Sequence, residues 1–527
     1  MWPYAAGGVG AAGRRRLPLI QVRAGHGGIV LSALLAALPL LLVLLLMLGK
    51  RWSGVRAGLA GLCTALVIGW LGFGLTWRVF WVSQVRGLML ALYVLYIIWP
   101  ALLLYNLAHD NGGITLVERW LADRVSDRPA AGLLFAWCLS AVLEGIAGFG
   151  VPLAVISPML LSFGFSPVVA VTAVAVGHAW SVTFGDMGVV FEALLAVVRL
   201  KAAELAPAAS LMLGLVCLGC GYSAATIIGL RHRRWAVAVV ALAMAGVQAG
   251  LAGSPLRPLA ALMAGLGGLA VGVLLFGRFG TTKSSHDTSG GSYRALLPYV
   301  CTTAILSVIA FFPALRSMLG QVRTTVILPE VTTRTGWVTA AGQAKAIDWL
   351  THPGTAMLAG VLLSLPWLRR AGSRGTLLTA ARKAEAVAAP ASLGIITMMG
   401  LAMLMDHAGM TQTLAIALSR ILGRSYPLIA GYIGMLGAFT TGSNTNSNVL
   451  FGPLQLQMAQ LLVLDRRWLL AAQTAGGALG SMVAPAKLVV GCATVGLIGK
   501  DGLVLRRTFA YALAIALVVG VVVLALA

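Results

Sequence analysis

Charged side chains are scarce in this sequence. They make up 10% of the 527 residues, whereas 59% are hydrophobic, and the mean hydropathy is +0.93. A soluble globule of this size would need far more polar surface than these residues supply. The composition therefore excludes a soluble protein. Repeated apolar runs of about 20 residues, the length that a bilayer core requires, predict a chain that crosses the lipid bilayer many times.

Acidic residues are rarer still, since 15 Asp and Glu face 38 Lys and Arg and leave a formal net charge of +23. A nucleic-acid partner would require these basic residues on one face with stacking aromatics. They lie instead in short clusters between apolar runs, such as 231–234 and 369–383. Such clusters are typical of cytoplasmic loops. We therefore predict no nucleic-acid partner, and we expect loop 231–234 on the cytoplasmic face.

Cysteines and enzyme motifs are also sparse. The six cysteines mostly lie in or beside apolar runs, where a thiol packs as a small hydrophobe. Cys217-x-x-Cys220 has a redox or metal spacing, but no second pair or histidine accompanies it. The sequence has no HExxH and no GxSxG with His and Asp in reach. We predict no metal, no cofactor and no catalytic residue. An intramembrane enzyme and a sensor without flux are the less favoured alternatives.

Two segments of the chain resemble each other at an offset of about 297 to 299 residues. In each, an apolar stretch is interrupted in its middle by small and polar residues. Half-helices of about 12 to 16 residues on either side of such a tip are too short to cross the bilayer separately, so they predict a re-entrant hairpin. A second interrupted apolar segment follows each hairpin. The predicted hairpins are 130–163 and 426–463, and the predicted broken helices are 167–200 and 468–500.

The repeat predicts an all-α integral membrane protein with about 12 crossings in two inverted copies. An odd number of crossings before the second copy turns it upside down relative to the first. The expected units are an N-terminal tail at 1–27, a first repeat at 28–230, linking helices and a loop at 231–295, and a second repeat at 296–527.

The tip of the second hairpin is the most polar feature at membrane depth. Its side chains are costly to bury unless something satisfies their hydrogen bonds. The following half-helix directs its free N–H groups and positive dipole end at the tip, which favours a bound carboxylate. The alternative is that these side chains cap the half-helices. The predicted substrate-binding residues here are Ser443, Asn444, Thr445, Asn446, Ser447 and Asn448.

The tip of the first hairpin is glycine-rich and carries an acid. Gly148, Phe149 and Gly150 are assigned to substrate binding, because glycine permits close backbone approach. Glu144, an intramembrane acid, is a candidate proton-coupling residue. The alternative is an acid permanently paired with a basic neighbour.

The two broken helices carry the remaining candidates. Asp186 and Lys487 occupy nearly equivalent places, so an inverted arrangement brings them together. Lys487 would then neutralise a substrate carboxylate, and Asp186 would take a proton. The alternative is a static ion pair that holds the breaks in register. His178 is a candidate proton relay, with a structural role as the alternative.

Four segments together resemble the L-lactate permease family, in order and spacing, over roughly residues 30–525. They read LEGIAGFGVP at 143–152, GTA at 354–356, TGSNTNSNVLF at 441–451 and CATVGLIGK at 492–500. The resemblance implies a proton symporter of the bacterial inner membrane, with a small organic anion as its partner. The implied substrate is a 2-hydroxymonocarboxylate: L-lactate, D-lactate or glycolate.

The tip Ser443-Asn444-Thr445 is also similar to the hairpin motif of divalent-anion:sodium symporters. That similarity implies an elevator-type mechanism in a homodimer. It also keeps open a sodium-coupled carrier of another small organic anion. Three positions depart from the permease pattern as the resemblance implies it, which has Asp in place of Asn444, a small apolar residue in place of Asp186, and Gln in place of Lys487.

Overall fold

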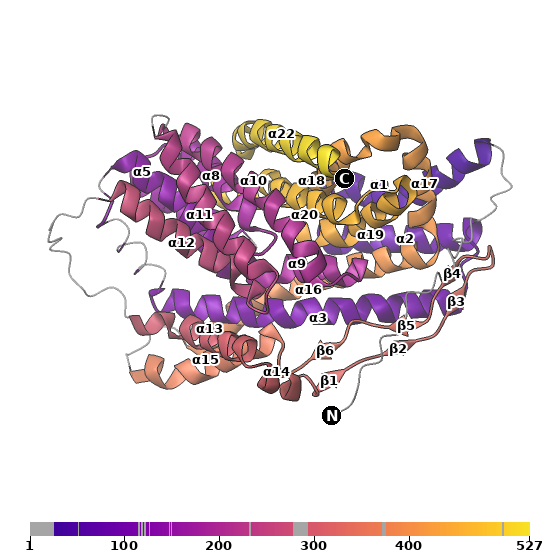
Figure 1. Ribbon diagram of the computed structural model, residues 1–527, viewed down its shortest axis with the longest axis horizontal. Coiled ribbons are helices and arrows are strands. Elements are labelled where there is room, and N and C mark those ends of the chain that lie inside the picture. The colour runs from indigo at the N-terminus through magenta and orange to yellow at the C-terminus, as the bar shows by residue number, and fades with distance from the viewer. Residues whose placement is uncertain are drawn as a thin grey trace, which may run out of the picture.

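The computed structural model is a bundle of helices with one short excursion into β-structure (Figure 1). Twelve helices in the described part of the chain are long and apolar enough to cross a membrane, which confirms an all-helical, multi-pass protein. The structure describes residues 26–50, 52–113, 116, 120, 123–125, 127–146, 148, 150–230, 233–277, 293–370, 376–497 and 500–527. Nearly all of the expected N-terminal tail therefore lies outside the described residues.

The elements of the first half follow the interruptions seen in the sequence. Three long helices come first, then two interrupted helices, then a long closing helix. In chain order they are α1 (His26–Gly49), α2 (Gly54–Gly72), α3 (Trp77–Asp110), α5 (Arg128–Leu133), the π-helical turn η1 (Leu134–Leu139), α6 (Ser140–Ile146), α7 (Val151–Ser162), α8 (Pro167–His178), η2 (Ala179–Ser181), η3 (Asp186–Gly188), α9 (Val189–Val198) and α10 (Ala202–Ile228).

The linking elements and the second half repeat this order after two further helices. In chain order they are α11 (Arg234–Ala252), η4 (Arg257–Leu259), α12 (Ala260–Phe276), η5 (Tyr293–Leu296), α13 (Leu297–Phe311), α14 (Pro313–Leu319), α15 (Pro353–Arg370), α16 (Leu377–His407), α17 (Met410–Leu422), η6 (Gly423–Ser425), α18 (Tyr426–Thr441), α19 (Asn444–Leu462), α20 (Arg466–Val483), α21 (Pro485–Thr494) and α22 (Asp501–Leu526).

The twelve candidate spans differ in two places from the crossings that the sequence predicted. The segment Arg128–Ile146 was expected to be a half-helix, yet η1 joins α5 and α6 into a segment long and apolar enough to span on its own. Conversely, the apolar part of α15, Pro353–Leu368, is shorter than the other spans. Apolar length alone therefore did not separate the arm of a hairpin from a full crossing.

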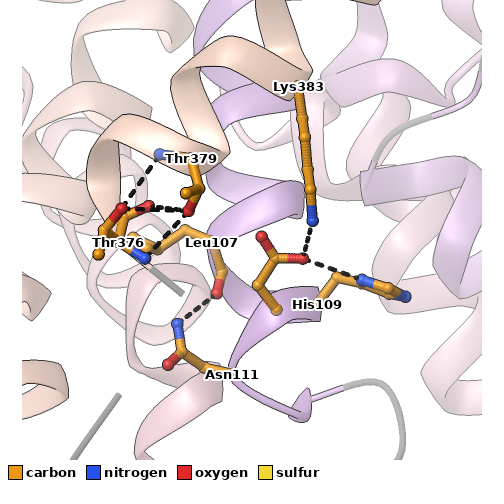
Figure 2. Close-up of polar contacts among 7 residues, drawn as sticks. Leu107, His109, Asn111, Thr376, Thr379 and Lys383 are labelled. Atoms are coloured by element: carbon orange, nitrogen blue, oxygen red, sulfur yellow. Dashed lines mark hydrogen bonds and ion pairs between the residues drawn. The ribbon is translucent and has the colours of Figure 1, made fainter. Parts of the chain in front are cut away.

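The long helices α3 and α16 pack against each other along the bundle. Gly87 allows the close approach, because a Cβ atom there would lie 3.1 Å from the carbonyl oxygen of Met399. At one end of the pair, Lys383 of α16 donates from Nζ to Oδ1 of Asp110 at 2.6 Å (Figure 2). A Thr376–Thr379 capping box starts α16 beside this contact. The two helices are thereby fixed in both spacing and register.

Helices of the two halves pack across each other rather than side by side. The second helix of the first half, α2, lies on α16, and its counterpart in the second half, α15, lies on α3. The closing helices bridge the two halves, since α10 packs on both α8 and α20, and α22 packs on α18 and α20 as well as on α8. The halves are therefore interlocked.

A β-ribbon connects α14 to α15, which the expectation of an all-α chain omitted. Its strands form three antiparallel pairs in the order β1–β6, β2–β5 and β3–β4, and the ribbon runs beside α3 (Figure 1). At its tip, Arg334 donates from its backbone N–H to the carbonyl of Gly74 at 2.7 Å, and the Trp337 indole donates to the carbonyl of Asp406 at 3.1 Å. The strands are β1 (Arg323–Thr324), β2 (Ile327–Leu328), β3 (Val331–Thr332), β4 (Val338–Thr339), β5 (Gly342–Gln343) and β6 (Ile347–Asp348).

Candidate functional site

The break between α8 and α9 places Asp186 against the tip of the first predicted hairpin. Asp186 and Met187 have φ values of 49° and 54°, a left-handed conformation that side chains other than glycine seldom adopt. In this position Oδ1 of Asp186 accepts a hydrogen bond from the backbone N–H of Gly148. A Cβ atom at Gly148 would lie 2.6 Å from that oxygen, so any larger residue would displace the carboxylate. The break and the tip are thus held together by one carboxylate.

A second acid of the first half meets a base of the second half. Glu144 on α6 is fully buried, and its Oε1 lies 3.7 Å from Nζ of Lys487 on α21. Lys487 also donates to Oγ of Ser481 at 2.5 Å. Neither carboxylate oxygen of Glu144 accepts a hydrogen bond from the described residues. The pair is therefore an ion pair without the further hydrogen bonds that a buried carboxylate requires.

The alternative of a static ion pair between Asp186 and Lys487 does not match the contacts in the structure. Among the described residues, the carboxylate within 4.0 Å of the Lys487 ammonium is that of Glu144. Asp186 is nevertheless close, because Gly185 packs on Glu144, where a Cβ atom at Gly185 would lie 2.9 Å from Cγ of the glutamate. We call Glu144, Asp186 and Lys487 the charge cluster. When all three are ionised, its formal charge is −2 + 1 = −1.

The second hairpin tip faces the first break through amide side chains. Asn444 donates from Nδ2 to Oγ1 of Thr183 at 3.3 Å and to the carbonyl of Thr474 at 3.1 Å. Asn448 donates from Nδ2 to Oγ1 of Thr474 at 2.9 Å. The two threonine hydroxyls are themselves 3.1 Å apart. Both asparagine Oδ1 atoms are buried, and neither has a hydrogen-bond partner among the residues that the structure describes. This tip therefore presents acceptors rather than charge.

Other residues of the second tip have structural contacts. Ser443 accepts from the backbone N–H of Asn446 at 3.3 Å and so caps α19, as the capping alternative expects. Ser447 donates to the carbonyl of Gly434 at 2.7 Å, which fastens α19 to α18. Thr445 and Asn446 are buried. Capping thus accounts for Ser443 but not for the asparagine amides.

His178 is fully buried on α8, and its Nδ1 lies 2.9 Å from the carbonyl oxygen of Val174 on the same helix. Its Nε2 has no hydrogen-bond partner among the described residues. Of the first tip, Gly150 is buried with a φ of 85°, whereas Phe149 lies outside the described residues.

Sequence reasoning missed Thr183 and Thr474, which link the second tip to the first break. A signal was available for Thr474, because Gln473-Thr474 is a polar pair in an Ala- and Gly-rich stretch of α20. Within the described ranges, no group of three or more His, Cys, Asp or Glu side chains is placed to hold a metal ion.

Twelve potential spans, together with a buried polar site where two interrupted helices and two hairpin-like tips meet, define a multi-pass membrane protein of the permease type. The chain belongs to the L-lactate permease family, whose profile matches residues 32–527. This match confirms the resemblance drawn from the four sequence segments. Family membership points to a transporter rather than an enzyme.

Individual relatives match along almost their whole length. The L-lactate permease of Escherichia coli (strain K12) is 28% identical over 531 residues, covering 94% of this chain and 96% of the relative. The L-lactate permease of Bacillus subtilis (strain 168) is 26% identical over 557 residues, with the same coverage. Glycolate permease GlcA of Escherichia coli (strain K12) is 25% identical over 541 residues, again with 94% and 96% covered.

Proposed function

We propose that this protein imports a small 2-hydroxymonocarboxylate by proton symport across the bacterial inner membrane. L-lactate is the first candidate substrate, with D-lactate and glycolate next. The family and relatives named as lactate and glycolate permeases support this substrate class. Their bacterial sources support the inner membrane as the location.

The observation that carries proton coupling is the charge cluster. Two buried carboxylates lie in a cluster with one ammonium, which pairs with Glu144, and among the described residues no hydrogen bond stabilises the Glu144 charge. A bound substrate carboxylate would change the formal charge of the cluster from −1 to −2. Buried charge of that size is costly, and a proton on Glu144 or Asp186 lowers it. Anion binding and proton binding therefore favour each other, which is the thermodynamic requirement for symport.

The substrate carboxylate would be bound by Lys487, with the two tips supplying further hydrogen bonds. Gly150 lies beside Lys487, since a Cβ atom there would be 3.8 Å from Cγ of the lysine. The N–H of Gly148 and the amides of Asn444 and Asn448 donate within the protein, so they would reach the substrate by exchanging these hydrogen bonds. Lys487 could exchange its contact with Glu144 for the substrate once the glutamate is protonated. The loaded site would then be closer to neutral than the empty ionised one.

Movement of the site is proposed to follow an elevator-type mechanism in a homodimer. The crossed packing of α2 on α16 and α15 on α3 supports two inverted repeats that form a common scaffold. The helix pairs α6–α7 and α18–α19 would be the re-entrant hairpins, moving with α8–α9 and α20–α21.

Counterflow of labelled L-lactate in proteoliposomes tests the proposal. Unlabelled glycolate and glycerate should compete, whereas sulfoacetate and dicarboxylates should compete weakly. An inward proton gradient should drive accumulation, and a protonophore should abolish it. Preference for a dicarboxylate, or accumulation indifferent to the proton gradient, would refute the substrate class or the coupling ion respectively.

A sodium-coupled carrier is the second candidate, and one observation favours it. The buried Oδ1 atoms of Asn444 and Asn448 have no hydrogen-bond partner, and carbonyl oxygens at broken helices bind Na⁺ in other transporters. In that case, replacing external Na⁺ by choline would abolish accumulation while a proton gradient would have little effect.

A further inference from the structure

A buried arginine without a hydrogen-bonding partner lies away from the charge cluster. Arg86 on α3 is 3% exposed, and its Nε and Nη1 atoms have no hydrogen-bond partner among the described residues. A charged guanidinium at such a place is costly unless an anion or hydrogen-bond acceptors satisfy it. Asp406 attracts it electrostatically, yet its carboxylate lies 3.9 Å from His407 and forms no ion pair with Arg86.

Arg86 lines a cavity of about 300 Å³ between α3, the end of α9 and the ribbon. Arg199 and Lys345 line it too, and no acidic residue does. The remaining wall is largely apolar, with Leu90, Leu195 and Met403 among its residues. Cavities of a few hundred Å³ with apolar walls and a few convergent polar groups are typical of small-ligand sites. We call this the Arg86 pocket.

The nearest acid on α9 is already satisfied. Glu192 accepts from Nε of Arg257 at 2.6 Å and from the Tyr93 hydroxyl at 3.2 Å, and Nζ of Lys345 lies 3.8 Å away. It therefore leaves Arg86 and Arg199 without a compensating charge. Two adjoining cavities, of about 350 and 200 Å³, share Lys345 with the Arg86 pocket and are lined by Arg257 and Arg316 as well. The adjoining cavities are also lined by Glu192, whereas the lining of the Arg86 pocket is basic or uncharged.

We propose that the Arg86 pocket is a second anion site, in which Arg86, Arg199 and Lys345 bind the carboxylate of the transported anion. The planar guanidinium of Arg86 can donate two parallel hydrogen bonds to a carboxylate, and the apolar wall accommodates a short carbon chain. This inference rests on the proposed function for the identity of the anion. It adds a place where the anion is held before it reaches, or after it leaves, the charge cluster.

The placement along α9 supports successive occupation. Asp186 precedes this helix of 10 residues and Arg199 follows it, so the two sites are separated by about 15 Å at a rise of about 1.5 Å per residue. Two unit charges at that distance repel by about 1 kcal/mol at an effective dielectric constant of about 20. An anion in one site therefore opposes an anion in the other only modestly, and both can be occupied together.

A lipid phosphate offers the same anionic oxygens as a carboxylate, so the experiment must separate the two sources. Equilibrium binding of labelled L-lactate to the purified full-length protein is measured in lipid-free detergent and in nanodiscs of phosphatidylcholine, with and without phosphatidylglycerol. Native mass spectrometry of the same samples reports retained lipid. If the pocket binds the substrate, Arg86-dependent lactate binding should be the same in detergent and in both kinds of nanodisc. Phosphatidylglycerol retained in an Arg86-dependent manner that lactate does not displace would overturn the proposal.

The first variant is Arg86→Gln. Because Arg86 is buried and its loss could destabilise the fold, the second variant is Arg199→Asn. Position 199 is exposed, and asparagine tolerates its left-handed backbone conformation. We expect the wild type to bind lactate in two classes of site. Either variant should weaken one class by at least about tenfold, the loss of a charge-assisted hydrogen bond. Arg78→Gln, which removes an exposed arginine from the same helix, is the matched control and should bind like the wild type.

Lys487→Gln should weaken the other class and leave the Arg86-dependent class intact. Wild-type isotherms in Arg86→Gln and Arg199→Asn, with lactate counterflow intact, would overturn the second site while leaving the proposed function standing. Absence of lactate binding and counterflow in the wild type would refute both.

Discussion

Replacing Lys487 by glutamine tests the charge cluster most directly. Its Nζ lies 3.7 Å from Oε1 of Glu144. Two unit charges at that distance attract by about 4 kcal/mol at an effective dielectric constant of about 20. Much of this attraction offsets the cost of burying both charges, so the fold should survive its loss. Glutamine can still donate to Ser481, and a proton on Glu144 removes the unpaired charge.

Substrate affinity should respond far more than folding. A substrate carboxylate that loses a charge-assisted hydrogen bond loses about 1.5–3 kcal/mol, or roughly 10- to 100-fold in affinity. We therefore expect the KM for L-lactate counterflow in Lys487→Gln proteoliposomes to rise by that factor, with a parallel rise in the dissociation constant of the purified protein. The melting temperature should change by a few degrees at most.

Two matched variants separate charge from side-chain loss. Lys487→Arg keeps the positive charge and should retain most of the affinity. Lys500→Gln makes the same substitution at an exposed position outside the cluster and should behave as wild type. If Lys487→Gln binds and transports lactate with unchanged KM, Lys487 does not contact the substrate, and the assignment of the cluster as the substrate site is wrong.

Further predictions concern the surroundings of the cluster. Adding Asp186→Asn to Lys487→Gln restores the formal charge of the cluster to −1, so the double variant should bind lactate more tightly than Lys487→Gln alone. A double-mutant cycle should give a coupling energy of about 0.5–3 kcal/mol. Strictly additive effects would argue against a shared cluster. Gly148→Ala should displace the Asp186 carboxylate and lower stability by about 1–3 kcal/mol, measured by thermal unfolding with and without lactate. Thr474→Val should remove the hydroxyl that accepts from the buried Asn448 amide and cost about 1–3 kcal/mol, and an unchanged melting temperature would contradict this. Burial lowers the pKa of His352 to about 4, so the ring is neutral between about pH 6 and 8, and His352→Gln should leave the pH profile of uptake unchanged.

The positions of the helix interruptions were predictable from sequence because they depend on local chemistry. Clustered glycine, proline and polar residues within an apolar run favour an interruption of the helix, and the breaks near Gly148, Ser443 and Pro485 lie where such clusters occur. What the sequence could not indicate was which groups meet. The pairing of Glu144 with Lys487, and not with any residue of its own half, depends on how two distant segments pack.

Sequence analysis missed two features, the buried position of Arg86 and the β-ribbon, because the start of one helix and the strands of the ribbon could not be placed from the sequence. Arg86 was not a candidate, because the sequence alone does not show where the helix starts, whereas α3 begins at Trp77 and carries Arg86 well inside. An intramembrane arginine would have been a candidate site at once. The ribbon was missed because each of its strands is two residues long, too short for an alternating pattern to be recognised, although β-branched residues recur from Thr324 to Thr339.

The three positions at which the sequence departs from the pattern implied by the resemblance lie on elements that contact one another. Asn444 donates to Thr183, which precedes Asp186 in the same break, and Asp186 and Lys487 both contact the segment from Glu144 to Gly148. An ionised aspartate at the position of Asn444 would have no donor, so it could not make the hydrogen bond that Asn444 donates to the carbonyl of Thr474. The Asn444 amide therefore links α19 to α20 by a hydrogen bond that an aspartate would not make. The carboxylate absent from that tip is present instead as Asp186, where it accepts from Gly148, and Lys487 compensates the added negative charge by pairing with Glu144. Because each change alters the charge or the hydrogen-bonding capacity that its neighbours require, the positions of Asp186, Asn444 and Lys487 should be exchanged as a set rather than singly.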